Sequence, residues 1–440
     1  MTRVRFAPGP TGHLSVSGAR VALANYLFAR RNGGEMLLRL DDLDAERCRP
    51  AHADAIMQDL QWLGIGWQAS VRQSERLELY QDAIERLKRD GFLYPCFESE
   101  EELKAKREFR RKRGQPIVYD RAMLRLTDQQ RRDAEAGGKR PHWRFKLSGR
   151  TLEWTDLVLG PRRAALTSVS DPIVARGDGT PTAIIASVVD DIDFATTHII
   201  RGADKAENAA VQIELFEVMA GASAAVRFAH LPALTDSAAS SGRPAGSRSL
   251  RSLRSDGVEP QAIAACLVGD QGDDGDPLPV DQLAARFELS SMAASRFDAD
   301  RLLALNRRAL SGLDFADVAG RLPGGATEAF WLAVRGHLDL LKEARGWWDV
   351  VAGSIVPPMM DEDREVLIAA GATLPPEPWD GTVWSNWISA LEEATGLSVN
   401  ALLTPLRLAL TGEDSGPDLA DLLPLIGRSR AASRLEVAGA

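Results

Sequence analysis

The sequence contains few cysteines and no long hydrophobic run. Its 440 residues include 3 cysteines, Cys48, Cys96 and Cys266, which lie too far apart in the chain to form a disulfide framework. So few thiols are typical of a protein of the reducing cytoplasm. No apolar run of about 18 residues occurs, and the first residues lack the apolar segment of a signal peptide. The sequence therefore predicts a cytoplasmic protein without a membrane span.

An excess of positive charge is also lacking. Lys and Arg number 53 against 62 Asp and Glu, which gives a net charge of −9. This balance argues against a nucleic-acid coat built on bulk positive charge, although it allows a local basic surface. With 45% hydrophobic and 26% charged residues, the chain is neither mainly disordered nor collagen-like. At this length we expect about two to four domains.

The N-terminal segment predicts a strand–turn–helix–strand unit. A short strand at residues 4–7 is followed by a Pro/Gly-rich turn at residues 8–12 and a helix over about residues 17–31. The helix ends at Asn-Gly-Gly, a typical C-terminal cap, and a second strand covers residues 35–40. This pattern opens a parallel α/β sheet, in which ligands bind at the carboxyl ends of the strands, here residues 8–12 and 41–44.

The remaining chain carries helical, strand-like and loop segments. Residues 50–113 look helical, a helix is expected at residues 208–219, and helical patterns resume from about residue 260. The stretch 236–255, rich in Ser, Ala, Gly and Arg, reads as a flexible loop. Strand-like runs occur at residues 143–147, 151–159, 181–189 and 197–200. Six of the ten tryptophans lie beyond residue 330, where they suit a helical core better than base-stacking platforms.

Several motifs follow one another along the chain. Residues 5–12 read R-F-A-P-G-P-T-G, residues 38–47 read L-R-L-D-D-L-D-A-E-R, and residues 228–232 read F-A-H-L-P. V-V-D-D at residues 188–191 and P-L-R-L-A-L-T-G at residues 405–412 extend the series. In this order and spacing the motifs resemble those of bacterial glutamyl-tRNA synthetases, a class I aminoacyl-tRNA synthetase family. The resemblance covers nearly the whole chain.

The resemblance implies a fold, a reaction and a set of partners. The implied fold is a Rossmann-type parallel sheet with an inserted α/β acceptor-binding domain, followed by helical stem-contact and anticodon-binding domains. The expected boundaries are residues 1–75 and 181–235 for the two halves of the catalytic domain, 76–180 for the insertion, 236–310 for the signature loop and stem-contact region, and 311–440 for the anticodon-binding domain. The implied enzyme is a glutamate–tRNA ligase, which activates glutamate with ATP and Mg²⁺ as an adenylate and transfers it to the 3′ end of tRNA. A Glu-type or another tRNA is the expected partner of a monomeric protein.

The resemblance also implies residues that bind the amino acid. Arg5 and Arg201 would hold the two carboxylates of glutamate, because a guanidinium fork binds a carboxylate bidentately. Asp41, where the family has Glu, would meet the ammonium group. The other substrate-binding positions are Ala7, Ala183 and Ser187. Ala183 stands where the family has a pocket tyrosine, so a ring and a hydroxyl are absent.

The first ATP-binding signature departs from the family pattern. Residues 15–18 read S-V-S-G, where the family has H-I-G-G or H-V-G-G. Ser15 can donate one neutral hydrogen bond but carries no positive charge, and Ser17 adds a side chain where glycine lets the nucleotide lie close. Either His13 replaces the missing imidazole, or it is simply exposed to solvent. The predicted catalytic positions are Ser15, Ser17, Gly18 and Arg243, and the predicted ATP-binding positions are Thr11, Gly12, Gly18 and Arg243.

The second signature departs further. Residues 240–244 read S-S-G-R-P in place of K-L-S-K-R, so only Arg243 keeps a positive charge. Losing one positioned donor typically lowers a rate by about 10²–10³-fold. Three functions therefore stay open from the sequence: a working glutamate–tRNA ligase, a catalytically impaired paralogue that binds tRNA or another ligand, and a repurposed acyl-transfer enzyme.

Two features of the insertion complete the prediction. Some family members bind zinc through C-x-C and Y-x-x-x-C, but here Cys96 is the only thiol of that set. One thiol does not build a tetrahedral zinc site, so we expect no zinc or other bound metal and a buried Cys96. The basic run at residues 104–113 is either a contact surface for tRNA phosphates or a solvated helix face.

Overall fold

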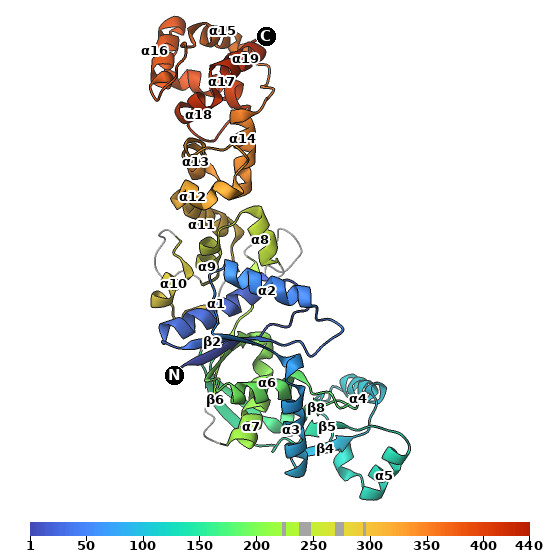
Figure 1. Cartoon of the computed structure of the whole chain (residues 1–440). Coiled ribbons are helices and arrows are strands. Elements are labelled where there is room, and N and C mark those ends of the chain that lie inside the picture. Colours follow the sequence, from blue (N-terminus) through green and yellow to red (C-terminus); the bar gives the residue numbers. More distant parts are fainter. Residues whose placement is uncertain (222–225, 237–247, 269–276, 294–295) are drawn as a thin grey trace. The chain divides into compact units, whose positions relative to one another are not determined.

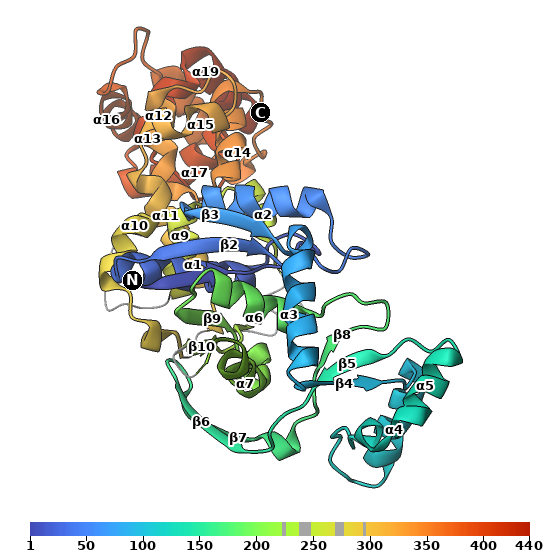
Figure 2. The same ribbon diagram turned by 60° about the horizontal axis from the view of Figure 1, so that its bottom comes forward.

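A parallel sheet forms around the first strand of the chain. In the computed structural model, β1 (Arg3–Phe6) pairs in parallel with β2 (Glu35–Leu40), and β2 pairs in parallel with β3 (Ala69–Arg72) (Figure 1). Figure 2 shows β2 and β3 running together. The two strands predicted at the N-terminus are thus confirmed.

The structure describes most of the chain. The described residues are 1–221, 226–236, 248–268, 277–293 and 296–440. They fall into two compact units, of which the first contains residues 1–252 and the second contains residues 299–440, while shorter segments between them contribute to both. No helix within the described ranges has the length and apolar character needed to cross a membrane.

The helix α1 (Val16–Arg31) connects β1 to β2, as predicted. Its amino end is capped by Ser15, whose Oγ accepts a hydrogen bond from Gly18 N at 3.1 Å. Behind its carboxyl end the chain turns through Gly33 at φ +57°. At Gly34 a Cβ atom would lie 2.3 Å from the Thr2 carbonyl oxygen, so a residue without a side chain lets β2 start against β1.

Two further parallel strands pair with each other beside this sheet. β9 (His198–Gly202) pairs in parallel with β10 (Arg227–Leu231). Thr197 N, just before β9, donates to the Arg3 carbonyl oxygen at 2.9 Å, which places β9 next to β1. The resulting order β3–β2–β1–β9–β10 is that of a doubly wound nucleotide-binding sheet, and it confirms the expected Rossmann-type architecture.

The segment predicted as a strand at residues 181–189 is a helix. α6 (Ala183–Asp193) buries Ile185, Ala186 and Val188 together with its two carboxylates Asp190 and Asp191. A short apolar run fits a buried helix as well as a strand, and here the packing of the surrounding elements selects the helix. The following helix, α7 (Ala209–Ala220), agrees with the prediction.

Other expectations for the first unit need correction. Residues 50–113 are not continuously helical, because β3 and β4 (Leu93–Cys96) interrupt the helices α2 (Pro50–Trp62), α3 (Leu77–Arg89) and α4 (Glu100–Lys112). The run at residues 151–159 is the first strand of a hairpin formed by β6 (Thr151–Asp156) and β7 (Gly160–Ala165). The loop predicted at 236–255 ends in a helix, α8 (Leu250–Asp256), while residues 237–247 lie outside the described residues.

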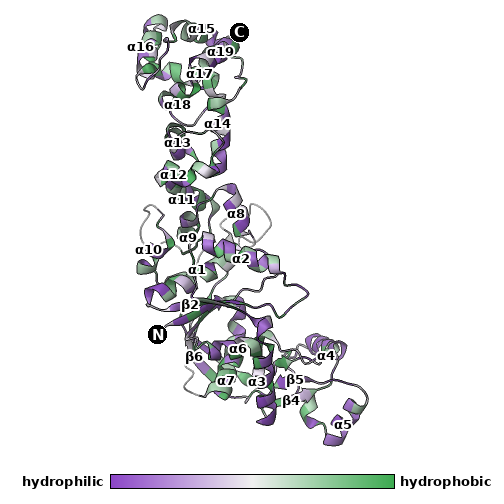
Figure 3. Ribbon diagram, viewed as in Figure 1, coloured by the Kyte–Doolittle hydropathy of each residue, from purple (hydrophilic) through white to green (hydrophobic). Residues whose placement is uncertain are grey.

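The insertion is built on antiparallel strands. β4 pairs with β5 (His142–Phe145), and β5 pairs with β8 (Ile173–Ala175). Two polar helices, α4 and α5 (Asp128–Ala136), bury none of their residues, and Figure 3 shows α4 in hydrophilic colours. The antiparallel strands and the hairpin share one apolar core with α6, α7 and β9, which ties the insertion to the parallel sheet.

The second unit is helical. Its longer helices are α11 (Ala299–Gly312), α13 (Glu328–Val334), α14 (Ala344–Ala352), α15 (Arg364–Thr373), α16 (Val383–Thr395), α17 (Val399–Thr411), α18 (Leu419–Ile426) and α19 (Arg428–Ala438). All six tryptophans beyond residue 330 belong to its apolar core or pack against it, and Trp331 and Trp387 are fully buried. The indole N–H groups of these two donate to the carbonyl oxygens of Leu313 and Ala370. The prediction that these tryptophans form a core is confirmed.

Candidate active site

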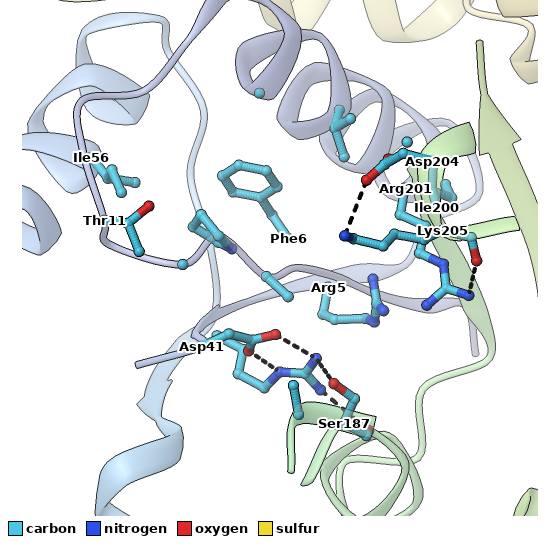
Figure 4. A pocket seen from close by; sticks show the side chains of 18 of the residues that line it. Arg5, Phe6, Thr11, Asp41, Ile56, Ser187, Ile200, Arg201, Asp204 and Lys205 are labelled. Atoms are coloured by element: carbon cyan, nitrogen blue, oxygen red, sulfur yellow. Dashed lines mark hydrogen bonds and ion pairs between the residues drawn. The ribbon is translucent and has the colours of Figure 1, made fainter. Parts of the chain in front are cut away.

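A cavity of about 560 Å³ opens at the carboxyl ends of the parallel strands. Its wall comes from the loop after β1, from Asp41 after β2, from Arg201 on β9 and from α6 (Figure 4). The predicted residues that line it are Arg5, Ala7, Thr11, Gly12, Ser15, Gly18, Asp41, Ala183, Ser187 and Arg201. The fold thus gathers positions that are up to about 200 residues apart in the sequence at the sheet edge where such folds bind ligands.

Of the predicted catalytic positions, Ser15 and Gly18 line the cavity, whereas Ser17 and Arg243 need separate comment. Ser17 lies in the first turn of α1 and is not among the lining residues. Arg243 and the rest of the second signature, residues 240–244, lie outside the described residues.

Arg39 on β2 organises the floor of the site. Its side chain is 1% exposed, and its Nε donates to Asp41 Oδ1 at 2.7 Å while its Nη1 donates to Asp191 Oδ1 at 3.1 Å. Its Nη2 also reaches Ser187 Oγ at 3.3 Å. Burial alone would lower the pKa of Arg39, but the carboxylates around it, Asp41 first, outweigh burial and raise it. Burial raises the pKa of the Asp41 carboxyl, and this effect outweighs the positive charge of Arg39, which lowers it.

Arg5 shares a carboxylate with Arg39. Its Nε donates to Asp191 Oδ1 at 3.0 Å, and the Arg5 side chain is 4% exposed. Asp190, the preceding residue on α6, accepts from Arg76 Nε at 2.8 Å and from Tyr80 Oη at 2.9 Å. Buried guanidinium and carboxylate groups therefore alternate behind the cavity, and this arrangement satisfies charges that would be costly alone.

Arg201 differs from the other two arginines of the site. Among the described residues it forms no ion pair, because its hydrogen bonds go to His230 Nε2 at 3.1 Å and to the Lys205 carbonyl oxygen at 3.1 Å. Burial, and then the positive charge of Arg5, lower the pKa of Arg201 to about 9. A half-buried guanidinium with neutral partners at the cavity wall is suited to an incoming anion.

Further lining residues were not singled out from the sequence. Lys205 Nζ lies 3.1 Å from Asp204 Oδ2, and both side chains are more than half exposed at the cavity wall. Gln212 on α7 is 3% exposed, and within the described part of the chain its Oε1 has no hydrogen-bond partner. The sequence does indicate a special role for Arg39, because this charged residue interrupts the apolar strand Leu-Leu-Arg-Leu. Nothing in the sequence around Gln212 indicates that it lies at the site.

The loop before α1 holds the altered first signature. Ser15 Oγ is engaged by Gly18 N, as described above, and Val16 N donates to the Arg248 carbonyl oxygen at 2.9 Å. His13 is exposed, lines the cavity, and packs edge-to-face on His52 with ring centroids 5.5 Å apart. An imidazole therefore stands at the cavity wall, although not at the position where the family carries it.

The surroundings of Cys96, where the sequence predicts no zinc, form a hydrogen-bonded set of side chains. Cys96 Sγ lies 3.6 Å from Tyr119 Oη, which donates to Glu98 Oε2 at 2.6 Å. Cys96 is fully buried, as expected, and burial raises the pKa of its thiol to about 11. Across the described part of the chain, no group of three or more His, Cys, Asp or Glu side chains could hold a metal ion.

The basic run lies on α4, where Lys104, Arg107 and Arg111 share one exposed face. Lys106 pairs with Glu98 and Arg107 pairs with Glu100. Lys104, Arg111 and Lys112 are exposed, and no described residue forms an ion pair with them. A local positive surface thus exists on an acidic chain.

The sequence and the structure were compared with those of known proteins. Residues 1–267 match the model for the catalytic domain of class I tRNA synthetases (E and Q), and residues 359–438 match an anticodon binding domain. The chain is 54% identical to glutamate–tRNA ligase 2 of Acidiphilium cryptum, with 99% of each chain covered. It is 50% identical to glutamate–tRNA ligase 2 of Gluconacetobacter diazotrophicus, with 99% of each covered. Its structure is similar to that of a glutamate tRNA ligase from Elizabethkingia meningosepticum in complex with its amino acid, with a TM-score of 0.83, 25% identity and 99% of each chain covered.

Proposed function

The chain belongs to the class I tRNA synthetases (E and Q), and from this premise we propose that it is a glutamate–tRNA ligase. In this proposal ATP activates glutamate as an adenylate, and the glutamyl group passes to the 3′ end of a Glu-type or another tRNA. ATP with Mg²⁺ enters as a substrate. A monomeric, cytoplasmic protein is part of the same proposal.

The unpaired charge of Arg201 carries this proposal. It faces a cavity that also presents the carboxylate of Asp41, so one wall suits an anion and another suits an ammonium group. An amino acid carries both groups, and a dicarboxylic one gains a second contact from Arg5. The loop at Thr11, Gly12 and Ser15 and the amino end of α1 adjoin the same cavity, and helix N-termini attract phosphate groups.

The experiment that tests the proposal is ATP–pyrophosphate exchange with glutamate, in the presence and absence of total tRNA, beside a gel shift with the same tRNA. Exchange above background, dependent on glutamate, supports the ligase. A second candidate, a tRNA-binding protein without adenylation, is favoured by one observation: Ser15 stands where the family has histidine, and its hydroxyl oxygen is already used to cap α1. Binding of tRNA without exchange supports this second candidate.

Replacing Arg201 tests the anion contact directly. We expect Arg201→Ala to weaken L-glutamate binding by about 10²-fold, because a charge-assisted contact to a carboxylate contributes about 1.5–3 kcal/mol. Isothermal titration calorimetry on the full chain measures the dissociation constant. The control is Arg227→Ala on β10, an exposed arginine outside the cavity. Equal affinities of the two variants would contradict the assignment.

Removing charge from α4 tests the tRNA contact. In the double variant Lys104→Ala/Arg111→Ala, tRNA affinity should fall, and the slope of log K against log salt should become shallower by about two, since each phosphate contact contributes about one. Filter binding over a salt series measures both. The control removes the same two charge types at Lys139 and Arg140, which are exposed before β5. A double α4 variant with the wild-type slope would assign this face to solvent.

A further inference from the structure

A buried chain of hydrogen bonds leads from Asp156 through His230 to Arg201. Asp156 Oδ2 lies 2.6 Å from His230 Nδ1, and Arg201 Nε donates to His230 Nε2 at 3.1 Å. Asp156 is 2% exposed and His230 is 1% exposed. Asp156 lies on β6, His230 on β10 and Arg201 on β9. The β6–β7 hairpin is therefore connected to the cavity residue Arg201 by the side chains of Asp156 and His230.

The hydrogen bonds determine which ring nitrogen of His230 carries a proton. The Nε–H group of Arg201 can only donate, so His230 Nε2 must be the acceptor. Nδ1 then carries the hydrogen and donates to Asp156. Although burial alone would raise it, hydrogen bonds from the ring and from backbone N–H groups lower the pKa of Asp156 to about 2, so this partner is a carboxylate.

The backbone holds the other oxygen of Asp156. Asp156 Oδ1 accepts from Val158 N at 3.0 Å, Leu159 N at 2.9 Å and His230 N at 3.1 Å. These three donors fix the carboxylate plane, so Oδ2 is directed at the imidazole. The orientation of the ring is therefore determined from behind, by the turn between β6 and β7.

We propose that Asp156 and His230 are positioning residues, which hold the guanidinium of Arg201 for the carboxylate of an amino-acid substrate. The inference rests on the proposed function in that Arg201 is the group that meets this carboxylate. The physical reason is that a neutral imidazole orients the guanidinium without neutralising it. A carboxylate in the place of His230 would orient Arg201 equally well but would pair with its charge, and the attraction for the substrate would fall.

The variant Asp156→Asn tests the proposal because it inverts the tautomer. The Asn Oδ1 keeps accepting the three backbone N–H groups, so its NH₂ group must face His230 Nδ1. Nδ1 then becomes an acceptor, the proton moves to Nε2, and Nε2–H confronts the Nε–H of Arg201. Inversion of an imidazole by the same Asp→Asn change is known to disable a catalytic histidine. We expect glutamate binding to weaken by about tenfold or more, the cost of losing a hydrogen bond to a charged group.

Two readouts on the full chain are required. Nitrogen-15 and carbon-13 NMR of labelled histidine reports the tautomer, with His230 assigned from the signal that disappears in His230→Phe. Calorimetry reports the dissociation constant of L-glutamate. The matched control is Glu153→Gln, an equal charge change on the same strand β6, at a side chain that is 72% exposed. It should leave both the tautomer and the affinity at wild-type values.

The outcomes separate positioning from mere structural support. Nδ1–H in the wild type, Nε2–H in Asp156→Asn and weaker glutamate binding in that variant alone support the proposal. An Nε2–H ring in the wild type overturns it, and so does wild-type affinity in Asp156→Asn after the tautomer has inverted. If the wild type binds no glutamate, the proposed function fails. The tautomers then still test whether Asp156 orients His230 toward Arg201: inversion in Asp156→Asn supports this part of the proposal, and an unchanged ring overturns it.

Discussion

Asp191→Asn is expected to lower the melting temperature of the first unit by about 6–12 °C. Asp191 Oδ1 accepts from both Arg5 and Arg39, whereas its Oδ2 has no hydrogen-bond partner among the residues that the structure describes. An asparagine can keep Oδ1 in place and turn its NH₂ group to the unpartnered side, so the hydrogen bonds survive and only the charge is lost. Leaving buried charge uncompensated costs about 3–5 kcal/mol, and a domain of this size loses about 2–4 °C per kcal/mol. Arg39 keeps Asp41, which places the expected cost near the lower end.

The matched control for this variant is Asp193→Asn. Asp193 lies two residues further along α6 and pairs with Arg76 at 2.5 Å, but its side chain is 53% exposed. Removing the charge of an exposed pair changes stability by about 1 kcal/mol or less. Differential scanning calorimetry of the full chain measures the transition of the first unit. Equal shifts in melting temperature in the two variants would show that the buried charge of Asp191 contributes no more to stability than the exposed charge of Asp193.

The double variant Ser15→His/Ser17→Gly is expected to raise ATP–pyrophosphate exchange by about 10²-fold, the effect of one positioned donor on a developing charge. The imidazole would return to the family position at the cavity, and glycine would return to the position at which Ser17 adds a side chain. The change has a cost, because Ser15 Oγ caps α1 by accepting from Gly18 N. Loss of a serine cap lowers stability by about 1 kcal/mol.

The control for this variant separates the cap from the chemistry. Thr127 caps α5 in the same way, with its side chain accepting from Gln130 N at 3.2 Å, and it lies outside the cavity. Thr127→His should therefore reduce the melting temperature to a similar extent without any gain in exchange. Exchange that stays at background in Ser15→His/Ser17→Gly, while tRNA still binds, would count against a weakened ligase and for a tRNA-binding protein.

The sequence by itself determined the family and the edge of the sheet at which the site lies. Motifs such as R-F-A-P-G-P-T-G and L-R-L-D-D resemble those of the family, and each runs into the carboxyl end of a strand. The strands β1 and β2 and the helix α1 also follow from local patterns, since a cap at Ser15 and glycines at 33–34 bound them. The changes at residues 15, 17 and 183 are likewise visible only as departures from that pattern.

The tertiary structure decided which charges are buried and which are free. Val-Val-Asp-Asp at residues 188–191 allows a strand or a helix, and only the packing of α6 against the sheet turns Asp191 toward Arg5 and Arg39. Nothing local distinguishes Arg201 from those two arginines. It keeps its charge for a ligand because its hydrogen-bond partners, His230 Nε2 and the Lys205 carbonyl oxygen, are neutral. His230 lies on β10, which meets β9 only in the folded sheet. Pattern and propensity act over a few residues, whereas the burial and pairing of these charges depend on contacts between residues far apart in the sequence, such as Asp191 with Arg5 and Arg39.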